Sequence, residues 1–375
     1  MIVGFDATTL TGRISGVGYY TARLMESLAN GAGEGVVRRL VVLSNRPVPV
    51  EETERVQVYE RRRFAVRSVW MQLVLPGILR DVKPDLVHFT NYLAPLAGRV
   101  PYLVSFHDMS LALLPQFHTL KKRLLTSSLI PAVARGARMI LTPSESTRRD
   151  VVRLLRVDPG RVRMIPYAPG PAFRPLPLAP ERLEARHGIR APYFLYVGTL
   201  EPRKNLARTL RAFASVADAL PAGCRFVIVG QRGWRYDDVL REAAHPALRG
   251  RVDFLGYVPE ERLPDLYAHA LATVYPSLYE GFGLPVVESM ACGTPVLTSR
   301  SSSLAEIGEG AALLADPVDE KALAEALHAL ATDASLRGRL RALGLERARA
   351  FTWERTGRET AAAYQEVYDD VRRRP

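Results

Sequence analysis

The chain has 375 residues, 47% hydrophobic and 24% charged, a composition typical of a globular protein long enough for two domains. Its formal net charge of +12 suits a phosphorylated small molecule, an anionic membrane surface or nucleic acid as a partner, although basic residues spread over solvated faces would give the same number. The two cysteines, Cys224 and Cys292, exclude a disulfide framework and a cysteine-rich metal site.

Short apolar runs alternate with helical segments from the first residues onward. The first run starts at once, without the basic leader of a signal peptide, and no run reaches the roughly 18 apolar residues that span a bilayer. We therefore expect a cytoplasmic protein. In the first half of the chain, the runs predicted as buried parallel strands are residues 2–7, 39–45, 85–90, 102–108 and 138–144.

A proline-rich stretch, residues 166–180, separates the two halves. Proline continues neither a helix nor a central strand, so this stretch is predicted to be an interdomain linker. From residue 333 onward the pattern predicts helix without further strands. Between the linker and that point, the predicted strands are residues 193–200, 225–231, 252–258, 272–277, 295–299 and 311–316.

The alternation of apolar strands with helices predicts an α/β fold with two doubly wound, Rossmann-like domains. We predict an N-terminal domain over residues 1–170, completed by a C-terminal helix at about 355–375, and a C-terminal domain over residues 171–354. Ligands of such sheets bind at the carboxyl ends of the strands. The residues that follow each strand are therefore the candidates for function.

A glycine-rich turn follows the first predicted strand. Gly12, Gly16 and Gly18 precede a helical segment, and glycine allows the backbone to approach a phosphate at a helix N-terminus. The turn lacks the third glycine of the dinucleotide fingerprint, and no acidic residue closes the next strand. The pattern disfavours NAD but is compatible with a phosphate contact.

His107 and Asp108 end the strand predicted over residues 102–108. A histidine at this end of a strand is a candidate for the ligand crevice, and the alternative is a histidine held by local hydrogen bonds. Asp108 either orients His107 or belongs to an acceptor pocket, and the sequence leaves both roles open.

Arg203 and Lys204 stand directly before Asn205, the predicted N-cap of a helix. Cations at the positive end of a helix oppose its dipole unless an anion lies between them. The pair is therefore a candidate clamp for a phosphate or pyrophosphate, with two solvated cations as the alternative.

Glu280 and Glu288 flank a glycine-proline turn. Glu280 lies in a glycine-rich loop, and Glu288 lies in the helix that starts near Pro285 and stops at Gly293. An ordinary acidic residue at the start of a helix explains Glu288 but leaves Glu280 unexplained. A carboxylate accepts hydrogen bonds from neighbouring hydroxyls, so the pair is a candidate for binding ribose or hexose.

This spacing is the E-x7-E motif of retaining GT-B glycosyltransferases of family 4, and the chain resembles that family over nearly its whole length. The resemblance implies two Rossmann-like domains that face a central cleft, with the C-terminal helix crossing back to the N-terminal domain. One departure is Tyr167 to Gly170, where the family usually has an asparagine-glycine turn; it puts any role inferred for the linker in doubt. The remaining matching segments are SGVGYY, FHD, GTLEPRKN, VGQRG and FLGYVP.

The resemblance also implies residue roles. Glu288 would hold the ribose and Glu280 the donor sugar, with His107 assisting; Arg203 and Lys204 would bind the pyrophosphate. Glu280, His107, Arg203 and Lys204 would thus be the catalytic residues, and Asp108 would belong to the acceptor side. No metal is expected, since the sequence has no D-x-D triplet. The further donor contacts that the resemblance implies are Gly16, Gly18, Tyr257, Val258, Gly281, Phe282, Gly283 and Leu284.

The expected function is transfer of a hexose, with GDP-mannose as the guessed donor, to a glycan or lipid-linked acceptor with retention of configuration. It needs no cofactor and no nucleic acid. The alternatives are a nucleotide-sugar or polyanion binding protein without transfer activity, and an NAD-dependent oxidoreductase.

Two basic and apolar segments, residues 60–79 and 117–138, would suit an anionic membrane surface, or else be ordinary solvated helices. The residues that carry this suggestion are Arg61, Arg62, Arg63, Phe64, Trp70, Lys121, Lys122 and Arg123.

Overall fold

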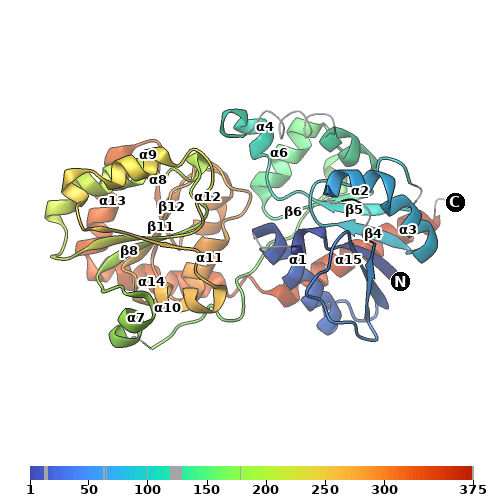
Figure 1. The fold of residues 1–375 in the computed structure, drawn as a ribbon, viewed down its shortest axis with the longest axis horizontal. Helices are drawn as coiled ribbons and strands as arrows, with labels where there is room; N and C mark the ends of the chain where they lie inside the picture. The colour runs from blue at the N-terminus through green and yellow to red at the C-terminus, as the bar shows by residue number, and fades with distance from the viewer. Residues whose placement is uncertain are drawn as a thin grey trace. The chain divides into compact units, whose positions relative to one another are not determined.

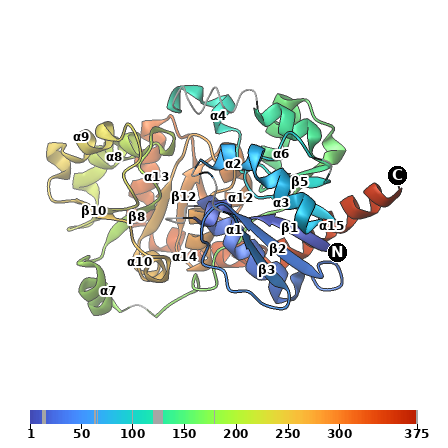
Figure 2. The same cartoon turned by 45° about the vertical axis from the view of Figure 1, so that its right-hand side comes forward.

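The computed structural model describes residues 1–11, 16–61, 64, 66–98, 100–118, 129–177 and 179–373. The chain divides into two compact units (Figure 1). Unit 1 comprises Met1–Tyr167 together with Thr352–Pro375, and unit 2 comprises Ala168–Phe351. Each unit is an α/β layer structure in which helices cover both faces of a parallel sheet (Figure 2).

The described part of unit 1 forms a seven-stranded parallel sheet in the order β3-β2-β1-β4-β5-β6-β7. The order reverses between β1 and β4, so this is the topological switch point where doubly wound sheets bind ligands. The strands are β1 (Ile2–Asp6), β2 (Arg39–Ser44), β3 (Val56–Glu60), β4 (Leu86–Phe89), β5 (Tyr102–Ser105), β6 (Met139–Thr142) and β7 (Val162–Met164).

The core of unit 1 lies between the sheet and helices α2 and α3, where Trp70, Leu75 and Ile78 are fully buried. On the other face, the C-terminal helix α15 (Trp353–Arg373) packs beside α1 (Gly16–Ser27) (Figure 1). Tyr364 of α15 is fully buried. The predicted return of this helix to the N-terminal domain is confirmed. The helices are α1 (Gly16–Ser27), α2 (Arg67–Leu73), α3 (Leu75–Val82), α4 (Ser110–Leu113), α6 (Glu145–Leu155) and α15 (Trp353–Arg373), and residues 129–136 are also helical.

Unit 2 has a six-stranded parallel sheet in the order β10-β9-β8-β11-β12-β13, with its switch point between β8 and β11. The six strands predicted for this half are all present. They are β8 (Tyr193–Val197), β9 (Arg225–Val229), β10 (Val252–Gly256), β11 (Ala272–Tyr275), β12 (Val296–Ser299) and β13 (Leu313–Ala315).

The helices of unit 2 alternate with its strands, and the last two follow the final strand, as predicted. They are α7 (Pro180–His187), α8 (Leu206–Val216), α9 (Asp237–Ala243), α10 (Leu263–His269), α11 (Leu284–Ala291), α12 (Ser302–Gly308), α13 (Glu320–Thr332) and α14 (Ala334–Ala348).

The proline-rich stretch holds no helix or strand over residues 165–177, as predicted. It nevertheless packs onto unit 2, because Phe173 is buried and its ring meets that of Tyr267 edge to face, with centroids 5.8 Å apart. Phe173 therefore belongs to the core of unit 2.

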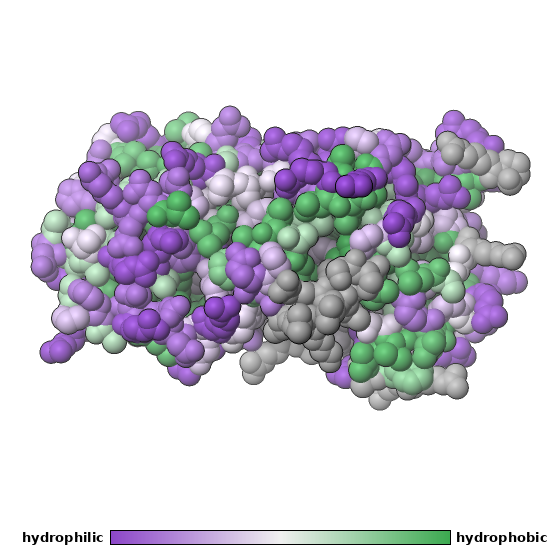
Figure 3. Space-filling model, turned by 90° about the horizontal axis from the view of Figure 1, so that it is seen from above, coloured by the Kyte–Doolittle hydropathy of each residue, from purple (hydrophilic) through white to green (hydrophobic). Residues whose placement is uncertain are grey.

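The structure corrects one part of the suggested membrane surface. Trp70 is fully buried and its indole Nε1 donates to the carbonyl of Arg61 at 2.9 Å, so it cannot face a lipid surface. Arg62, Arg63 and the basic cluster at 121–123 lie outside the described residues. Val66 and Leu73 are exposed, at 59% and 69%. Figure 3 shows one face of the molecule, on which apolar patches lie within a mainly hydrophilic surface. Over the described ranges, no helix is long and apolar enough to cross a membrane.

Candidate functional site

Two segments leave the switch point of unit 2 side by side. The short 3-10 turn Pro202–Lys204 follows β8, and the loop 276–283 follows β11, which pairs in parallel with β8. The backbone joins them, since Leu278 N–H donates to the carbonyl of Arg203 at 2.9 Å. Arg203 Nη1 in turn donates to the carbonyl of Tyr279 at 2.7 Å. The sheet register therefore brings together residues that are far apart in the sequence.

Glu280 lies between two cations in this joint. Its Oε2 accepts from Arg203 Nη1 at 2.8 Å, and its Oε1 accepts from Lys204 Nζ at 2.7 Å. Arg203 also donates to Glu201 Oε1 at 2.6 Å, and Lys204 donates to the Tyr275 hydroxyl at 2.5 Å. We call Glu201, Arg203, Lys204 and Glu280 the ion cluster. It has two positive and two negative charges, and each of its side chains is almost completely buried.

The environment of Glu280 favours its charged form. Burial by itself would raise the pKa of this carboxyl, but the nearby Arg203 and Lys204 outweigh burial and lower the pKa to about 2. For Lys204, burial lowers the pKa and Glu280 partly offsets the effect. Removing one partner of a buried ion pair of this kind strongly destabilises the folded protein, because the other charge is left buried without a partner.

Asn205 holds the predicted N-cap position of α8, but its side chain does not cap the helix. It has a left-handed backbone with φ 63°, and its side chain accepts no backbone N–H of the first turn; its Oδ1 accepts instead from Arg208 Nη1 at 2.6 Å. Its amide Nδ2 donates to the carbonyls of Pro276 and Pro317, at 3.1 and 2.6 Å. The residue thus fastens the turn after β8 to the loop after β11.

Glu288 lies on α11 in a different environment. It is 8% exposed, and its Oε2 accepts from the Tyr267 hydroxyl at 2.8 Å. Burial raises the pKa of Glu288 to about 7, and in the part of the chain that the structure describes no cation pairs with it. At neutral pH this carboxyl is poised between its two forms.

The loop between the two glutamates is buried and supported from behind. Ser303 Oγ donates to the carbonyls of Glu280 and Phe282, at 2.9 and 2.6 Å, and Ser302 Oγ accepts from Glu280 N–H at 3.1 Å. Gly283 has φ 120°, and a Cβ there would lie 2.6 Å from Leu304 Cδ2. Only glycine therefore fits this turn, which leads directly into α11 at Leu284.

These supporting serines were missed by sequence reasoning. The run Ser301–Ser303, which is the N-cap and the first two residues of α12, is typical of the start of a helix, and its link to a loop more than twenty residues earlier has no local signal.

Four other predicted donor contacts have different environments. Tyr257 follows β10 and is 59% exposed, whereas the adjoining Val258 packs against the core of unit 2. In unit 1, Gly16 begins α1 and is exposed, while Gly18 is buried within that helix. Gly12, from the same predicted turn, lies outside the described residues.

His107 follows β5 in unit 1, and both of its ring nitrogens are bonded. Nε2 lies 2.7 Å from the carbonyl of Thr90, and Nδ1 lies 2.6 Å from the Tyr167 hydroxyl. A carbonyl only accepts, so Nε2 carries the proton and Nδ1 accepts from Tyr167. Burial lowers the pKa of His107 to about 4, so the ring is neutral. Of the two possibilities that the sequence left open for His107, the structure has the one in which local hydrogen bonds hold the ring.

Asp108 does not orient the imidazole. Its Oδ1 accepts from the backbone N–H and the hydroxyl of Ser110, at 2.9 and 2.8 Å. Its own N–H donates to the Tyr92 hydroxyl at 2.8 Å. The role of Asp108 on the acceptor side stays a prediction.

Comparison with known proteins matches both units. Residues 181–347 match the family described as glycosyl transferases group 1, and residues 14–168 match glycosyltransferase family 4. A relative from Escherichia coli, O-antigen chain mannosyltransferase B, is 36% identical over 296 residues, which cover 76% of each chain. The chain belongs to the group 1 glycosyltransferases.

Other relatives of this glycosyltransferase carry names that state different reactions. A D-inositol 3-phosphate glycosyltransferase from Acidothermus cellulolyticus is 29% identical, over 77% of this chain and 68% of its own. Among solved structures, sucrose-phosphate synthase from Thermosynechococcus elongatus aligns with a TM-score of 0.79 at 21% identity, covering 98% of this chain and 99% of that one. Anabaena Alr3699/HepE, solved with UDP and glucose, aligns with a TM-score of 0.77 at 17% identity, covering 98% and 100%. These likenesses confirm the predicted GT-B fold.

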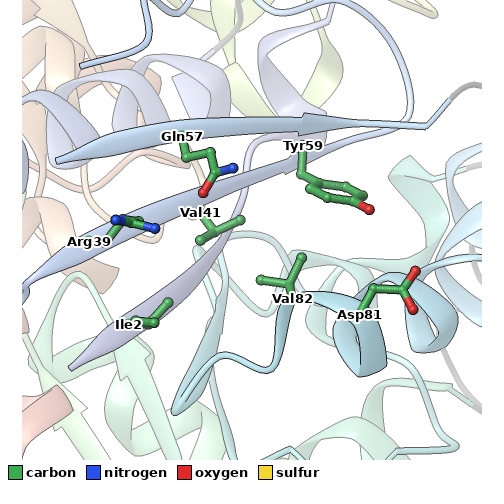
Figure 4. Close-up of a pocket in the computed structure, with 7 residues that line it drawn as sticks. All are labelled: Ile2, Arg39, Val41, Gln57, Tyr59, Asp81 and Val82. Atoms are coloured by element: carbon green, nitrogen blue, oxygen red, sulfur yellow. The ribbon is translucent and has the colours of Figure 1, made fainter. Parts of the chain in front are cut away.

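A pocket of about 210 Å³ lies elsewhere on this glycosyltransferase, where α3 ends against β1, β2 and β3 (Figure 4). It includes Ile2 and Arg39, the first residues of their strands, whereas doubly wound sheets bind ligands at the opposite ends. We therefore do not assign it to the candidate site. It is lined by Ile2, Arg39, Val41, Gln57, Tyr59, Asp81 and Val82.

Proposed function

We propose that this glycosyltransferase moves a hexose from a nucleoside-diphosphate sugar to a glycan or lipid-linked acceptor, with retention of anomeric configuration and without a metal. The observation that carries the proposal is the ion cluster at the switch point of unit 2, with Glu280 held between Arg203 and Lys204. Sugar hydroxyls and a diphosphate need carboxylates and cations in adjoining positions, and this arrangement supplies both.

The ion cluster is neutral as a whole, and this suits a ligand that arrives and leaves in each turnover. A diphosphate competes with Glu201 and Glu280 for the two cations, while each oxygen of Glu280 keeps a second lone pair for a sugar hydroxyl. When the bond to the sugar breaks, negative charge grows on the departing diphosphate. Arg203 and Lys204 are already positioned to stabilise that charge.

Glu288 is proposed to bind the ribose. It has one hydroxyl partner in the protein, and two donating ribose hydroxyls would favour its charged form. The backbones at Gly281–Leu284 and at Tyr257 and Val258 are proposed to complete the donor site of unit 2. Gly16 and Gly18 are the proposed contacts from unit 1.

For His107, the proposed catalytic role requires that the ring release one of its present partners. Both nitrogens are engaged, so contact with a donor sugar needs Nε2 to leave the Thr90 carbonyl or Nδ1 to leave Tyr167.

Mannose from GDP-mannose is the first candidate for the donor. The name of the Escherichia coli relative supports the sugar, and the UDP bound to the Anabaena protein makes uridine the first competitor for the base. The test is a screen of GDP-, UDP- and dTDP-sugars for release of nucleoside diphosphate, with and without saccharide acceptors. The anomeric signals of the product by NMR test retention, and excess EDTA tests metal independence. Absence of release with every donor, an inverted product or loss of activity in EDTA would each contradict the corresponding part.

Contact with an anionic membrane is a separate proposal. It is supported by the exposed Val66 and Leu73 at α2 and by the exposed Arg61 nearby. Flotation with liposomes that contain acidic lipid should carry the protein upward, and Leu73→Asp should reduce the floated fraction. Equal recovery with and without acidic lipid would contradict an electrostatic contact.

A further inference from the structure

A second polar cluster lies at the switch point of unit 1, between the ends of β1 and β4. Asp6 ends β1, Asn91 follows β4, and Arg67 opens α2. Arg67 Nη2 donates to Asp6 Oδ2 at 2.9 Å and to the carbonyl of Asn91 at 3.2 Å. Asp6 is 1% exposed, and its other oxygen accepts from the N–H and hydroxyl of Thr8. Each oxygen of Asp6 therefore has a partner inside the protein, Thr8 for Oδ1 and the Arg67 guanidinium for Oδ2.

Two polar atoms of this cluster lack the bonds that burial calls for. Arg67 Nε and Asn91 Oδ1 are both buried, and neither has a hydrogen-bond partner among the residues described. A buried polar atom without a partner is destabilising, so a protein rarely keeps two of them close together. One of them is a donor and the other an acceptor. A hydroxyl group both donates and accepts, and would satisfy either atom.

Asp108 brings a third group to the same edge of the sheet. Its Oδ1 is bonded to Ser110, and its Oδ2 makes no hydrogen bond within the described ranges. Tyr92, which follows Asn91, has a left-handed backbone with φ 49°, and its hydroxyl bonds to both the N–H and the carbonyl of Asp108. The left-handed backbone is unfavourable for tyrosine. The two hydrogen bonds of the Tyr92 hydroxyl hold the loop of Asn91 against the loop of Asp108.

The charges of this cluster indicate the class of ligand. Among the described groups, one guanidinium stands against the carboxylates of Asp6 and Asp108, so the balance is negative and the cation is already paired. That balance disfavours a phosphate and suits uncharged hydroxyls. We propose that Arg67, Asn91 and Asp108 bind the hydroxyls of an uncharged sugar at the accepting end of the acceptor. This inference rests on the proposed transfer reaction.

The proposal is tested by acceptor kinetics with the donor identified in the screen. Methyl α-mannoside and α-mannobiose serve as uncharged probes, and mannose 6-phosphate serves as the charged one. Release of nucleoside diphosphate is measured above the rate of acceptor-free donor hydrolysis. The uncharged sugars should have a kcat/KM at least about tenfold higher than the phosphorylated sugar. Preference for the phosphorylated sugar, or stimulation by none of the probes, would overturn the proposal.

Variants separate binding from folding. Asn91→Ala should raise the acceptor KM about tenfold, which corresponds to about 1.4 kcal/mol, and should leave both donor hydrolysis and Tm unchanged or Tm slightly raised. Arg67→Lys keeps a cation for Asp6 but lacks Nε, and should also raise the acceptor KM. The matched control is Asn45→Ala: Asn45 is buried and its Nδ2 donates to the carbonyl of Phe64, so its side chain already has a partner in the protein. That variant should lower Tm and leave the acceptor KM unchanged.

The outcomes distinguish this inference from the function on which it rests. If wild-type protein hydrolyses a donor but Asn91→Ala and Arg67→Lys keep the wild-type acceptor KM, only the acceptor site is wrong. If wild-type protein releases no nucleoside diphosphate from any donor, the proposed function fails and this inference fails with it.

Discussion

Glu280 and Glu288 lie in the same candidate site, and yet their environments oppose each other. Glu280 is held by two cations, and its pKa is lowered to about 2, whereas Glu288 has one hydroxyl partner and burial raises its pKa to about 7. The first carboxylate is charged and positioned before any ligand arrives. The second has a pKa near neutral pH, and we propose that a ligand with further donors completes its ionisation at that pH. The two halves of the proposed donor site are therefore preorganised to different degrees.

The largest expected effect is on kcat, from changing Lys204, one of the two cations that hold Glu280. Lys204→Ala should reduce kcat about 10²- to 10³-fold, because it removes a donor that stabilises charge on the leaving diphosphate. Steady-state release of nucleoside diphosphate measures it, with circular dichroism to confirm folding. Arg211→Ala is a control, since Arg211 pairs with Glu242 and Glu320 on the helical side of unit 2. Full turnover by Lys204→Ala at normal donor affinity would contradict the assignment.

Glu280→Ala should be the most destabilising change in the comparison. It leaves Arg203 and Lys204 almost buried beside a single remaining carboxylate, Glu201, and breaking a buried pair in this way costs about 3 to 5 kcal/mol. Urea unfolding monitored by tryptophan fluorescence measures the loss. An unfolding free energy equal to that of the wild type would show that the ion cluster contributes nothing to folding.

Glu288→Gln should raise the free energy of unfolding, whereas Glu280→Ala lowers it. The folded carboxyl has a pKa of about 7, above its ordinary value of 4.5, so its ionisation opposes folding as pH rises between these values. A neutral glutamine removes that cost while its Oε1 still accepts from Tyr267. The variant should be more stable than wild type by roughly 3 kcal/mol at pH 8 and by less than about 1 kcal/mol at pH 5, by the same linkage. Equal stability at both pH values would mean that Glu288 is not strained by burial.

The smallest effect on stability and donor binding is expected from changing Ser303, which supports the loop that carries Glu280. Ser303→Ala removes the donor to the carbonyls of Glu280 and Phe282 and should cost about 1 kcal/mol of stability. The donor KM should rise a few-fold, because the loop that carries Glu280 is less firmly held. An unchanged KM would indicate that the loop keeps its shape without Ser303.

The sequence was sufficient for the strands that form the interior of both sheets, because their apolar runs are continuous. It did not predict β3 and β7, the edge strands of unit 1, whose residues are partly exposed and give no such run. The placement of Trp70 on a membrane surface was wrong for a related reason. An aromatic residue beside basic ones resembles an interfacial segment, and only the packing against the sheet shows that it belongs to the core.

For the candidate site, the sequence identified the charged residues but not their partners. Arg203 and Glu280 are 77 residues apart, and it is the pairing of β8 with β11 that joins them. The bonds of His107 to Thr90 and Tyr167, and those of Arg67 to Asp6 and Asn91, depend on strand order in the same way. Local patterns carry no information on such contacts.

Isothermal titration of a nucleoside diphosphate at pH 6 and pH 8 tests the central claim most directly, with wild type compared with Glu288→Gln. The β-phosphate also titrates near pH 6, and the variant supplies that background. If ribose binding completes the ionisation of Glu288, wild type should bind about tenfold more weakly at pH 6 than at pH 8 beyond the change in the variant. Identical affinities and identical pH dependence in the two proteins would contradict a donor site built on this pair of glutamates.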